Sequence, residues 1–450
     1  MKIVKTAKLE IINNSYDFSE TIFIYKNALK FYIEVCEKEY NNYKDFQFSL
    51  EKRDYIEQIT HKTSKRPEVK YDFGKDFHKF PSYFRRSVIS EAIGIVSSHI
   101  NRLNSWKEKQ KSAKQNNKKF YEKPPKLNYE PKSFPTFFKG NMFLKNESII
   151  QIKVFKDNDW KFIDIKLKSK ELLSSNMYRF SNYSELSPSL FQKGKKFFLH
   201  FPFEKKVKLP EEKKIKLKNN TNTKVISVDL GLTNSAVCSC VCEDGTVLDR
   251  LFINQSKEKD HLNKLLNKIS KIKRESGISR KNVKKWKKVS NLQKYIVQDT
   301  VNKIVDFAIK HEVYCIVFEH LGKIKGKKSI RQKLHHWNKN NIQKRTMNKA
   351  HSYGIRMARI NPYNTSALAY DGSGKLERND RKDLSTFPSG KVYHSDLNAS
   401  YNIASRYFIR NILKPYSEKN KLKLQAKVPE ILNRSLCTLS TLIKLQQVEI

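Results

Sequence analysis

The spacing of hydrophobic residues changes several times along the chain, and each change predicts a different kind of structure. Apolar and polar residues alternate imperfectly over residues 2–12, which indicates a strand. From residue 17 to about residue 104 the spacing becomes helical. Residues 106–132 contain many lysines, glutamines and prolines and almost no aliphatic residues, so they predict a flexible basic connector. Alternation returns from about residue 134 to residue 210 and predicts an antiparallel β domain.

These segments predict how the first half of the chain is organised. If the first strand pairs with the later strands, residues 1–12 and 133–210 form one β-barrel-like domain. Residues 13–132 are then a helical insertion that includes the basic connector. The lysines and aromatic residues of the connector suit either a solvated loop or contact with a nucleic-acid backbone. Residues 211–223 are polar and predict a linker to the next domain.

The second half predicts an α/β domain over residues 224–412. The segments "VISVDL", "SAVCSCVC" and "TVLDRLFI" indicate a three-stranded meander, and a long basic helical region follows from about 256 to 312. "VYCIVFEHL" is apolar enough to be a strand buried on both faces, and "IRMARINP" indicates one more strand. "YHSDLNASYNIASRYFIRNIL" is an amphipathic helix. The helical region before the buried strand should pack on the sheet through one face, formed by Val297, Val301, Ile304, Val305, Ala308 and Ile309.

Charge and cysteine content narrow the class of protein. The chain of 450 residues has 90 Lys and Arg against 45 Asp and Glu, a net charge of +45 that indicates a polyanionic partner. It lacks a run of about 18 apolar residues and a signal-peptide core, so we expect a cytoplasmic protein without a membrane partner. The six cysteines do not resemble a disulfide framework. Cys238, Cys240 and Cys242 share one face of a strand, where small buried hydrophobes are expected rather than metal ligands.

Three acidic residues stand at positions where ionised side chains are costly. Asp229 lies in the first strand of the meander, Glu319 ends the buried strand, and Asp396 is in the opening turn of the last helix. These places can converge in a mixed sheet, and converging carboxylates commonly bind Mg²⁺. Two such ions about 3.5–4 Å apart would support phosphodiester cleavage, which suits a basic protein. Alternatively, Asp229 is an edge or turn carboxylate and Asp396 a helix cap.

The segments that carry these acids resemble a known family. "VISVDLGLTNSA", "CIVFEHL" and "HSDLNASYNIASR" are similar to the three motifs of the RuvC-like, RNase H-fold nuclease of the TnpB family, which insertion sequences encode and which is related to miniature type V CRISPR effectors. "LHHWNKNNIQKRTMNKAHSYGIRMARINPYNTS" resembles the block between the second and third motifs. The resemblance covers roughly residues 225–410.

The resemblance implies an RNA-guided, Mg²⁺-dependent DNA endonuclease of a prokaryotic cell. Its partners would be a guide RNA and double-stranded target DNA beside a short motif that the protein reads, and it would join the nucleoid when bound to DNA. A monomer is favoured, and transposon or CRISPR context stays open. Asp229, Glu319 and Asp396 would hold two Mg²⁺ ions. The β domain would be a wedge domain interrupted by a helical recognition lobe, with Tyr83, Arg85 and Arg86 as candidate nucleic-acid contacts.

The chain departs from the family in one respect. Members usually carry a four-cysteine zinc ribbon before the third motif, but residues 361–393 contain no cysteine. We expect no zinc there and predict a small metal-free hairpin built on "DGSG" and "PSG". The basic tail, residues 413–450, suggests no role.

Some polar residues leave two interpretations open. Trp337, with His335 and His336, could contact nucleic acid or serve packing and solvation. Asn398 and Asn402 could support the active site or cap the backbone locally.

Two other functions fit the motifs. An RNA-guided DNA-binding repressor without nuclease activity is disfavoured because inactive relatives should have lost an acid, and all three acids are present. A protein-only RNase H-fold nuclease, such as a transposase or junction resolvase, is disfavoured by the Asp–Glu–Asp order and by the size and charge of the chain.

Overall fold

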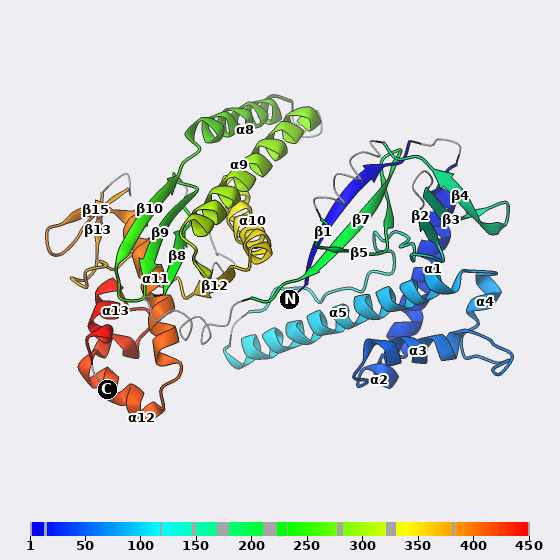
Figure 1. Ribbon diagram of the computed structural model, residues 1–450, viewed down its shortest axis with the longest axis horizontal. Coiled ribbons are helices and arrows are strands. Elements are labelled where there is room, and N and C mark those ends of the chain that lie inside the picture. The colour runs from blue at the N-terminus through cyan, green and yellow to red at the C-terminus, as the bar shows by residue number, and fades with distance from the viewer. Residues whose placement is uncertain are drawn as a thin grey trace. The chain divides into compact units, whose positions relative to one another are not determined.

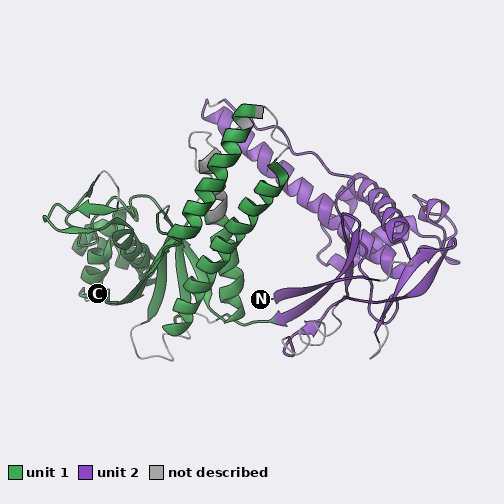
Figure 2. Cartoon of the chain, turned by 90° about the horizontal axis from the view of Figure 1, so that it is seen from above, with its two compact units in different colours: residues 1, 206–450 green, residues 2–205 purple. Residues whose placement is uncertain are grey.

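The chain folds into two compact units that meet in the sequence at the end of one long strand. A computed structural model describes residues 2–12, 16–117, 119–145, 150–168, 180–209, 223–231, 233–276, 282–320, 330–379 and 383–448, without the side chains of residues 273, 276 and 330–338. One unit comprises residues 2–205, and the other comprises residues 206–450 with Met1 (Figure 2). Except for Thr223, the predicted linker 211–223 lies outside the described residues.

Helices form one part of the N-terminal unit (Figure 1). The long helix α5 (Ser82–Gln115) begins directly after Pro81 and packs along α1 (Ser19–Lys38). Edge-to-face aromatic contacts, such as Tyr25 against Phe84 at 5.7 Å between ring centroids, fill the space between these helices. The shorter helices are α2 (Tyr40–Tyr43), α3 (Ser49–Thr60) and α4 (Phe73–Asp76). Residues 106–115 of the predicted flexible connector are helical, because their lysines, glutamines and alanine are good helix formers.

Strands form the other part of this unit. As predicted, the first strand, β1 (Lys2–Glu10), joins the later strands: it neighbours β7 (Lys196–Lys206), which also pairs with β5 (Ser184–Glu185) and β6 (Ser189–Lys193). A second, antiparallel sheet contains β2 (Phe143–Lys145), β3 (Ile150–Lys156) and β4 (Asp159–Ile165). The described strands do not close into a barrel, so the predicted β-barrel is unconfirmed. The wedge and recognition-lobe assignments stay predictions.

The C-terminal unit is built on a five-stranded mixed sheet with the order β10-β9-β8-β11-β12. β8 (Lys224–Asp229), β9 (Ala236–Cys242) and β10 (Val247–Ile253) form the predicted antiparallel meander. β11 (Cys315–Glu319) runs parallel to β8 on one side and to β12 (Arg356–Ile360) on the other. This mixed α/β architecture is the one that the sequence predicts for the second half.

Helices cover both faces of this sheet (Figure 1). On one face, α9 (Val283–Lys310) and α10 (Ile330–Ser352) share a hydrophobic cluster with alternate sheet residues, including Cys238 and Cys240. The predicted face of α9 lies in this cluster except for Ile309, which is 39% exposed. α11 (Ser395–Leu413) packs on the other face with α13 (Leu439–Gln446). The other helices in the described part of this unit are α8 (Ser256–Ser276), α12 (Glu418–Lys427) and a 3₁₀ helix, Pro429–Leu432.

The interval that lacks cysteines forms a small three-stranded sheet. Its strands are β13 (Glu377–Arg378), β14 (Leu384–Thr386) and β15 (Val392–His394). Gly372 and Gly390, in the predicted turns, have φ of +83° and +84°, a conformation that favours glycine. Ala369, Leu376 and Phe387 form a small core against two tyrosine rings. Apolar packing therefore supports this sheet.

Candidate active site

The fold brings the three predicted acids to the carboxyl ends of two neighbouring parallel strands of the mixed sheet. Asp229 and Glu319 are the last residues of the neighbouring parallel strands β8 and β11, where Val228 is paired with Phe318. Asp396 is the second residue of α11, which packs against β8. A Cβ atom added to Gly231, two residues after Asp229, would lie 3.3 Å from Asp396 Oδ2. The third carboxylate therefore lies beside the end of the first strand.

The other two carboxylates act electrostatically on Asp229. Burial raises the pKa of Asp229 well above its ordinary value, and the charges of Glu319 and Asp396 raise it further. Burial likewise raises the pKa of Glu319, although the hydroxyl of Thr365 opposes this by donating a hydrogen bond to its carboxylate. Such a group of partly buried acids is unfavourable unless cations approach it.

Positive side chains lie near this group, and Lys339 and Arg406 both lower the pKa of Glu319. The charges of Lys339 in α10 and Arg378 in β13 both lower the pKa of Asp229, against the stronger effect of burial. Arg378 also donates a hydrogen bond to the carbonyl oxygen of Ser366 at 2.6 Å, which holds the exposed side chain close to the site. Neither Lys339 nor Arg378 was predicted from the sequence, because no local motif places a hairpin or a basic helix beside three distant acids.

The donor chemistry fits Mg²⁺. Carboxylate oxygens are the ligands that this ion prefers, and Gly231 has no side chain that would press on the carboxylate of Asp396. Among the described residues, no three His, Cys, Asp or Glu side chains are grouped closely enough to hold one ion. Mg²⁺ is usually bound by one or two carboxylates together with water and substrate phosphates, so it does not require a preformed cage.

The close packing around Gly231 yields a testable prediction. The methyl group of Gly231→Ala would lie 2.8 Å from the carbonyl oxygen of Asn234 and would press on Asp396. Because misplacing reacting groups by about 1 Å can cost about 100-fold in rate, we expect the DNA cleavage that the family resemblance implies to fall by up to this amount. Gly94→Ala in α5 is the matched control, since a Cβ there meets nothing within 4 Å. Equal cleavage rates for both variants, measured at equal protein concentration, would contradict the prediction.

The residues predicted to contact nucleic acid differ in their surroundings. Arg85 is buried, and its guanidinium forms an ion pair with Glu57 at 2.8 Å. The exposed Arg86 lies 3.6 Å from the same carboxylate, while the partly exposed Tyr83 stacks on Phe138 with ring centroids 4.5 Å apart. The side chains of His335, His336 and Trp337 lie outside the described residues. Their nucleic-acid contacts stay predictions.

The two asparagines of the third motif support a neighbouring loop. Asn398 donates to the carbonyl oxygen of Leu368 at 2.8 Å and accepts a hydrogen bond from the backbone of Tyr370. Asn402 donates to the carbonyl oxygens of Thr365 and Leu368 at 3.0 and 2.9 Å. Of the two roles left open by the sequence, the structure therefore favours support of the site over local capping.

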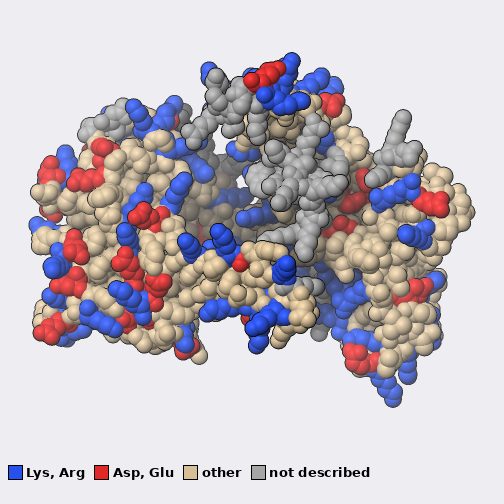
Figure 3. Space-filling view, turned by 180° about the vertical axis from the view of Figure 1, so that it is seen from behind, with Lys and Arg blue, Asp and Glu red and all other residues tan. Residues whose placement is uncertain are grey.

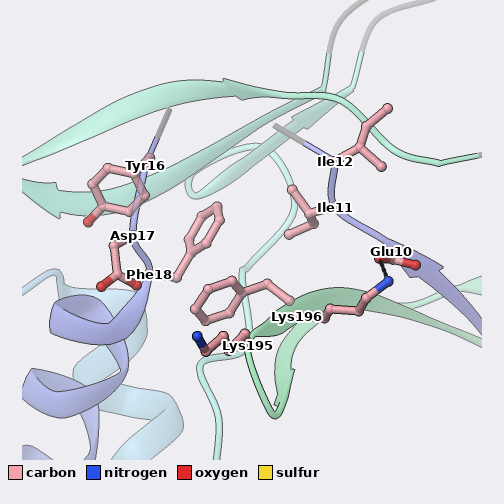
Figure 4. Close-up of a pocket in the computed structure, with 9 residues that line it drawn as sticks. Glu10, Ile11, Ile12, Tyr16, Asp17, Phe18, Lys195 and Lys196 are labelled. Atoms are coloured by element: carbon pink, nitrogen blue, oxygen red, sulfur yellow. Dashed lines mark hydrogen bonds and ion pairs between the residues drawn. The ribbon is translucent and has the colours of Figure 1, made fainter. Parts of the chain in front are cut away.

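A pocket elsewhere in the chain is not this site. It lies in the N-terminal unit, between the end of β1, the start of α1 and the turn before β7 (Figure 4). An ion pair between Glu10 and Lys196 spans part of its rim, and Phe18 and Phe197 pack edge to face inside it. None of the three acids lines this pocket.

Comparison with known proteins identifies relatives in sequence and in fold. A model of the Aq_aa04 family matches residues 5–156. The TnpB-like protein aq_aa05 of Aquifex aeolicus (strain VF5) is 27% identical over 242 residues, which cover 48% of this chain and 76% of that protein.

Solved structures extend the likeness over most of the chain. The mini-RNA-guided endonuclease CRISPR-Cas_phi3 matches with a TM-score of 0.55 at 13% identity, over 90% of this chain and 92% of that one. C2c1 of Alicyclobacillus acidoterrestris in complex with single-guide RNA matches with a TM-score of 0.54 at 8% identity, over 90% and 88%. At these identities the likeness establishes the fold alone. The chain is thus related in sequence to a TnpB-like protein and shares the fold of type V CRISPR effectors, which confirms the resemblance predicted from its three motifs.

Proposed function

We propose that this protein is an RNA-guided DNA endonuclease that cleaves guide-complementary DNA beside a short motif read by the protein. The observation that supports the proposal most is the convergence of Asp229, Glu319 and Asp396 at the end of β8 and β11. A structural role does not account for a carboxylate whose pKa is raised by burial and by two neighbouring acids. Such an arrangement suits a site that binds divalent cations and a phosphodiester.

Each part of the site has a distinct task in this proposal. Asp229, Glu319 and Asp396 would hold two Mg²⁺ ions, which supply water activation and stabilisation of the leaving oxygen when bound. Arg378 and Lys339 would attract the scissile phosphate and compensate its charge, since their positive charge already acts on Asp229. The parallel pairing of β8 and β11 fixes two of the carboxylates on adjacent strands, so little reorganisation is needed on substrate binding.

The partners follow from charge and from the relatives. The net charge of +45 suits binding of both a guide RNA and target DNA, and Figure 3 shows Lys and Arg side chains scattered over the surfaces of both units. One structural relative is described as an RNA-guided endonuclease and another was solved with single-guide RNA. We extend both properties to this chain. No described helix is long and apolar enough to span a bilayer, and a cytoplasmic location stays a prediction.

The proposal is tested by finding the guide and then using it. The gene is expressed with its native flanking DNA, the protein is purified in moderate salt, and the RNA that stays bound is sequenced. We expect one defined RNA whose end extends into neighbouring sequence. With that end reprogrammed, the complex should cut matching DNA in Mg²⁺ and leave mismatched DNA intact. Random RNA, together with cutting of DNA junctions or transposon ends by RNA-free protein, would instead establish the protein-only nuclease.

A further inference from the structure

One face of α11 holds the loop that follows β12. Asn398, Asn402 and Arg406 are spaced four residues apart, so their side chains project from the same side of the helix. All three are buried, with at most 5% of each residue exposed. Each donates hydrogen bonds to backbone carbonyl oxygens of residues 361–368. The helix that carries Asp396 therefore also fixes this loop.

Arg406 fixes the loop on one side and the C-terminal segment on the other. Its Nη1 donates to the carbonyl oxygens of Asn361 and Tyr363, at 3.2 and 2.5 Å. Its Nε and Nη2 donate to those of Cys437 and Ser435, at 3.1 and 2.8 Å. The planar guanidinium is suited to such a fork of contacts, which lysine cannot reproduce. Residues of the basic tail are thus part of the support of the loop.

The loop reaches the second acid through Thr365. This residue is 1% exposed, and its hydroxyl donates to Glu319 Oε1, with the carbonyl oxygen of Pro362 at 2.9 Å as a second acceptor. Its own carbonyl oxygen accepts from Asn402. Because Asn402 and Arg406 restrain the backbone around Thr365, its hydroxyl is held in one place. The carboxylate of Glu319 is thereby held through a hydrogen bond whose donor has little freedom to move.

We propose that Thr365 is a positioning residue that orients the carboxylate of Glu319 for metal binding, and that Arg406 supports Glu319 through Thr365. This inference rests on the proposed function, in which Glu319 is a metal ligand. Hydrogen bonds to a ligating carboxylate set its orientation, and their loss typically costs about 10- to 100-fold in metal affinity or activity. Since α11 also carries Asp396, one helix would fix two of the three ligands relative to each other.

The test uses substitutions that separate the hydroxyl group from the shape of the side chain. Thr365→Val removes the hydroxyl and keeps the branched shape, whereas Thr365→Ser keeps the hydroxyl. The guide-loaded protein is titrated with Mn²⁺, with free Mn²⁺ followed by electron paramagnetic resonance, and Glu319→Gln is the reference for loss of the ligand. We expect T365V to weaken Mn²⁺ binding on the order of 10-fold and T365S by less than about threefold. Binding of guide-matched DNA should be unchanged in both.

The role of Arg406 is tested by combining its substitution with that of Thr365 in a double variant. Arg406→Lys keeps the positive charge but loses the several hydrogen bonds of the guanidinium to backbone carbonyl groups. Because the hydroxyl of Thr365 is still present in this variant, it should weaken Mn²⁺ binding less than T365V does. If Arg406 acts through Thr365, the double variant R406K/T365V should bind Mn²⁺ as T365V alone does. Thermal unfolding of each variant, followed in parallel, shows how much of each protein is folded.

The outcomes separate this inference from the proposed function. Wild-type affinity for Mn²⁺ in T365V or E319Q would overturn the positioning role, as would equal losses in T365S and T365V. Additive effects in the double variant would overturn the link from Arg406. Failure of the wild-type protein to cut guide-matched DNA would instead overturn the proposed function, while the Mn²⁺ titrations would still decide the role of Thr365.

Discussion

Replacing Asp229 with asparagine is expected to abolish cleavage of guide-matched DNA while leaving guide and target binding in place. The charges of Glu319 and Asp396 both raise the pKa of Asp229. Asp229 is therefore the acid that we expect to bind both metal ions. Asparagine keeps the shape but loses the negative charge that attracts the cations. Because metal-bound groups stabilise both the attacking and the leaving oxygen, we expect the rate to fall by more than about 100-fold.

The same substitution should not destabilise the metal-free protein. Burial and two neighbouring carboxylates raise the pKa of Asp229 in the folded state, so the folded state binds more protons than the unfolded state above the unfolded pKa. The free energy of unfolding contributed by Asp229 therefore falls as pH rises above about 4. An asparagine side chain at this position does not titrate, so D229N should unfold at or above the wild-type temperature. The difference should grow as the pH rises above about 4 and level off once the pH exceeds the raised pKa of the folded state.

Asp249→Asn is the matched control in the same sheet. Asp249 lies in β10 and its pKa is lowered to about 2, chiefly by a hydrogen bond from Lys310 and then by the backbone of Arg250. Its stabilising effect is present above the unfolded pKa of about 4 and is lost as pH falls toward 2. D249N should therefore lower stability slightly at neutral pH and leave cleavage unchanged. Cutting that persists in D229N, or that is lost equally in D249N, would reject the assignment of the acids.

The three acids could be predicted from the sequence because each interrupts or ends a recognisable apolar pattern. Asp229 and Glu319 follow runs of buried residues, and a carboxylate in such a place requires a reason. The strand order β10-β9-β8-β11-β12, by contrast, is a tertiary property that brings together residues far apart in the chain. The hydrophobic pattern predicts that β8, β9 and β10 are neighbours, but only the motif resemblance suggested that β11 lies beside β8.

The cations and the supporting loop could not be predicted, because their places beside the acids are also a tertiary property. Arg378 lies on a two-residue strand, and Thr365 lies in a loop, so neither position carries a periodic signal. The tail shows a related limit. The apolar residues Leu439, Leu442 and Leu445 have helical spacing, but nothing local indicates that they pack with α11 or that Arg406 binds the carbonyl groups nearby. Short polar contacts to backbone carbonyls leave no pattern in a single sequence.

The salt dependence of DNA binding is expected to separate affinity that comes from the net charge of the protein from specificity that comes from base pairing. A protein that neutralises about 6–10 phosphates loses about 10³- to 10⁵-fold in affinity between 50 and 200 mM salt. With a net charge of +45, the RNA-free protein should show a loss of this size for any DNA duplex. The guide-loaded complex should keep its preference for matched over mismatched DNA across this range, because base pairing supplies the preference.

The amino-terminal half of α9 offers a direct test of where this charge acts. Lys287, Lys288 and Lys294 are exposed beside Tyr295, which is 55% exposed, and such a mixture of cations and an aromatic ring suits a nucleic-acid backbone and its bases. Each phosphate contact contributes about 0.9 to the slope of log affinity against log salt for duplex DNA. Replacing the three lysines with glutamine should reduce the slope by up to about 2.7. Lys303→Gln is the control on the same helix, since Lys303 forms an ion pair with Asp299 at 2.8 Å. An unchanged slope in the triple variant would show that nucleic acid is bound elsewhere on the basic surface, and the positive charge of α9 would then serve only solubility.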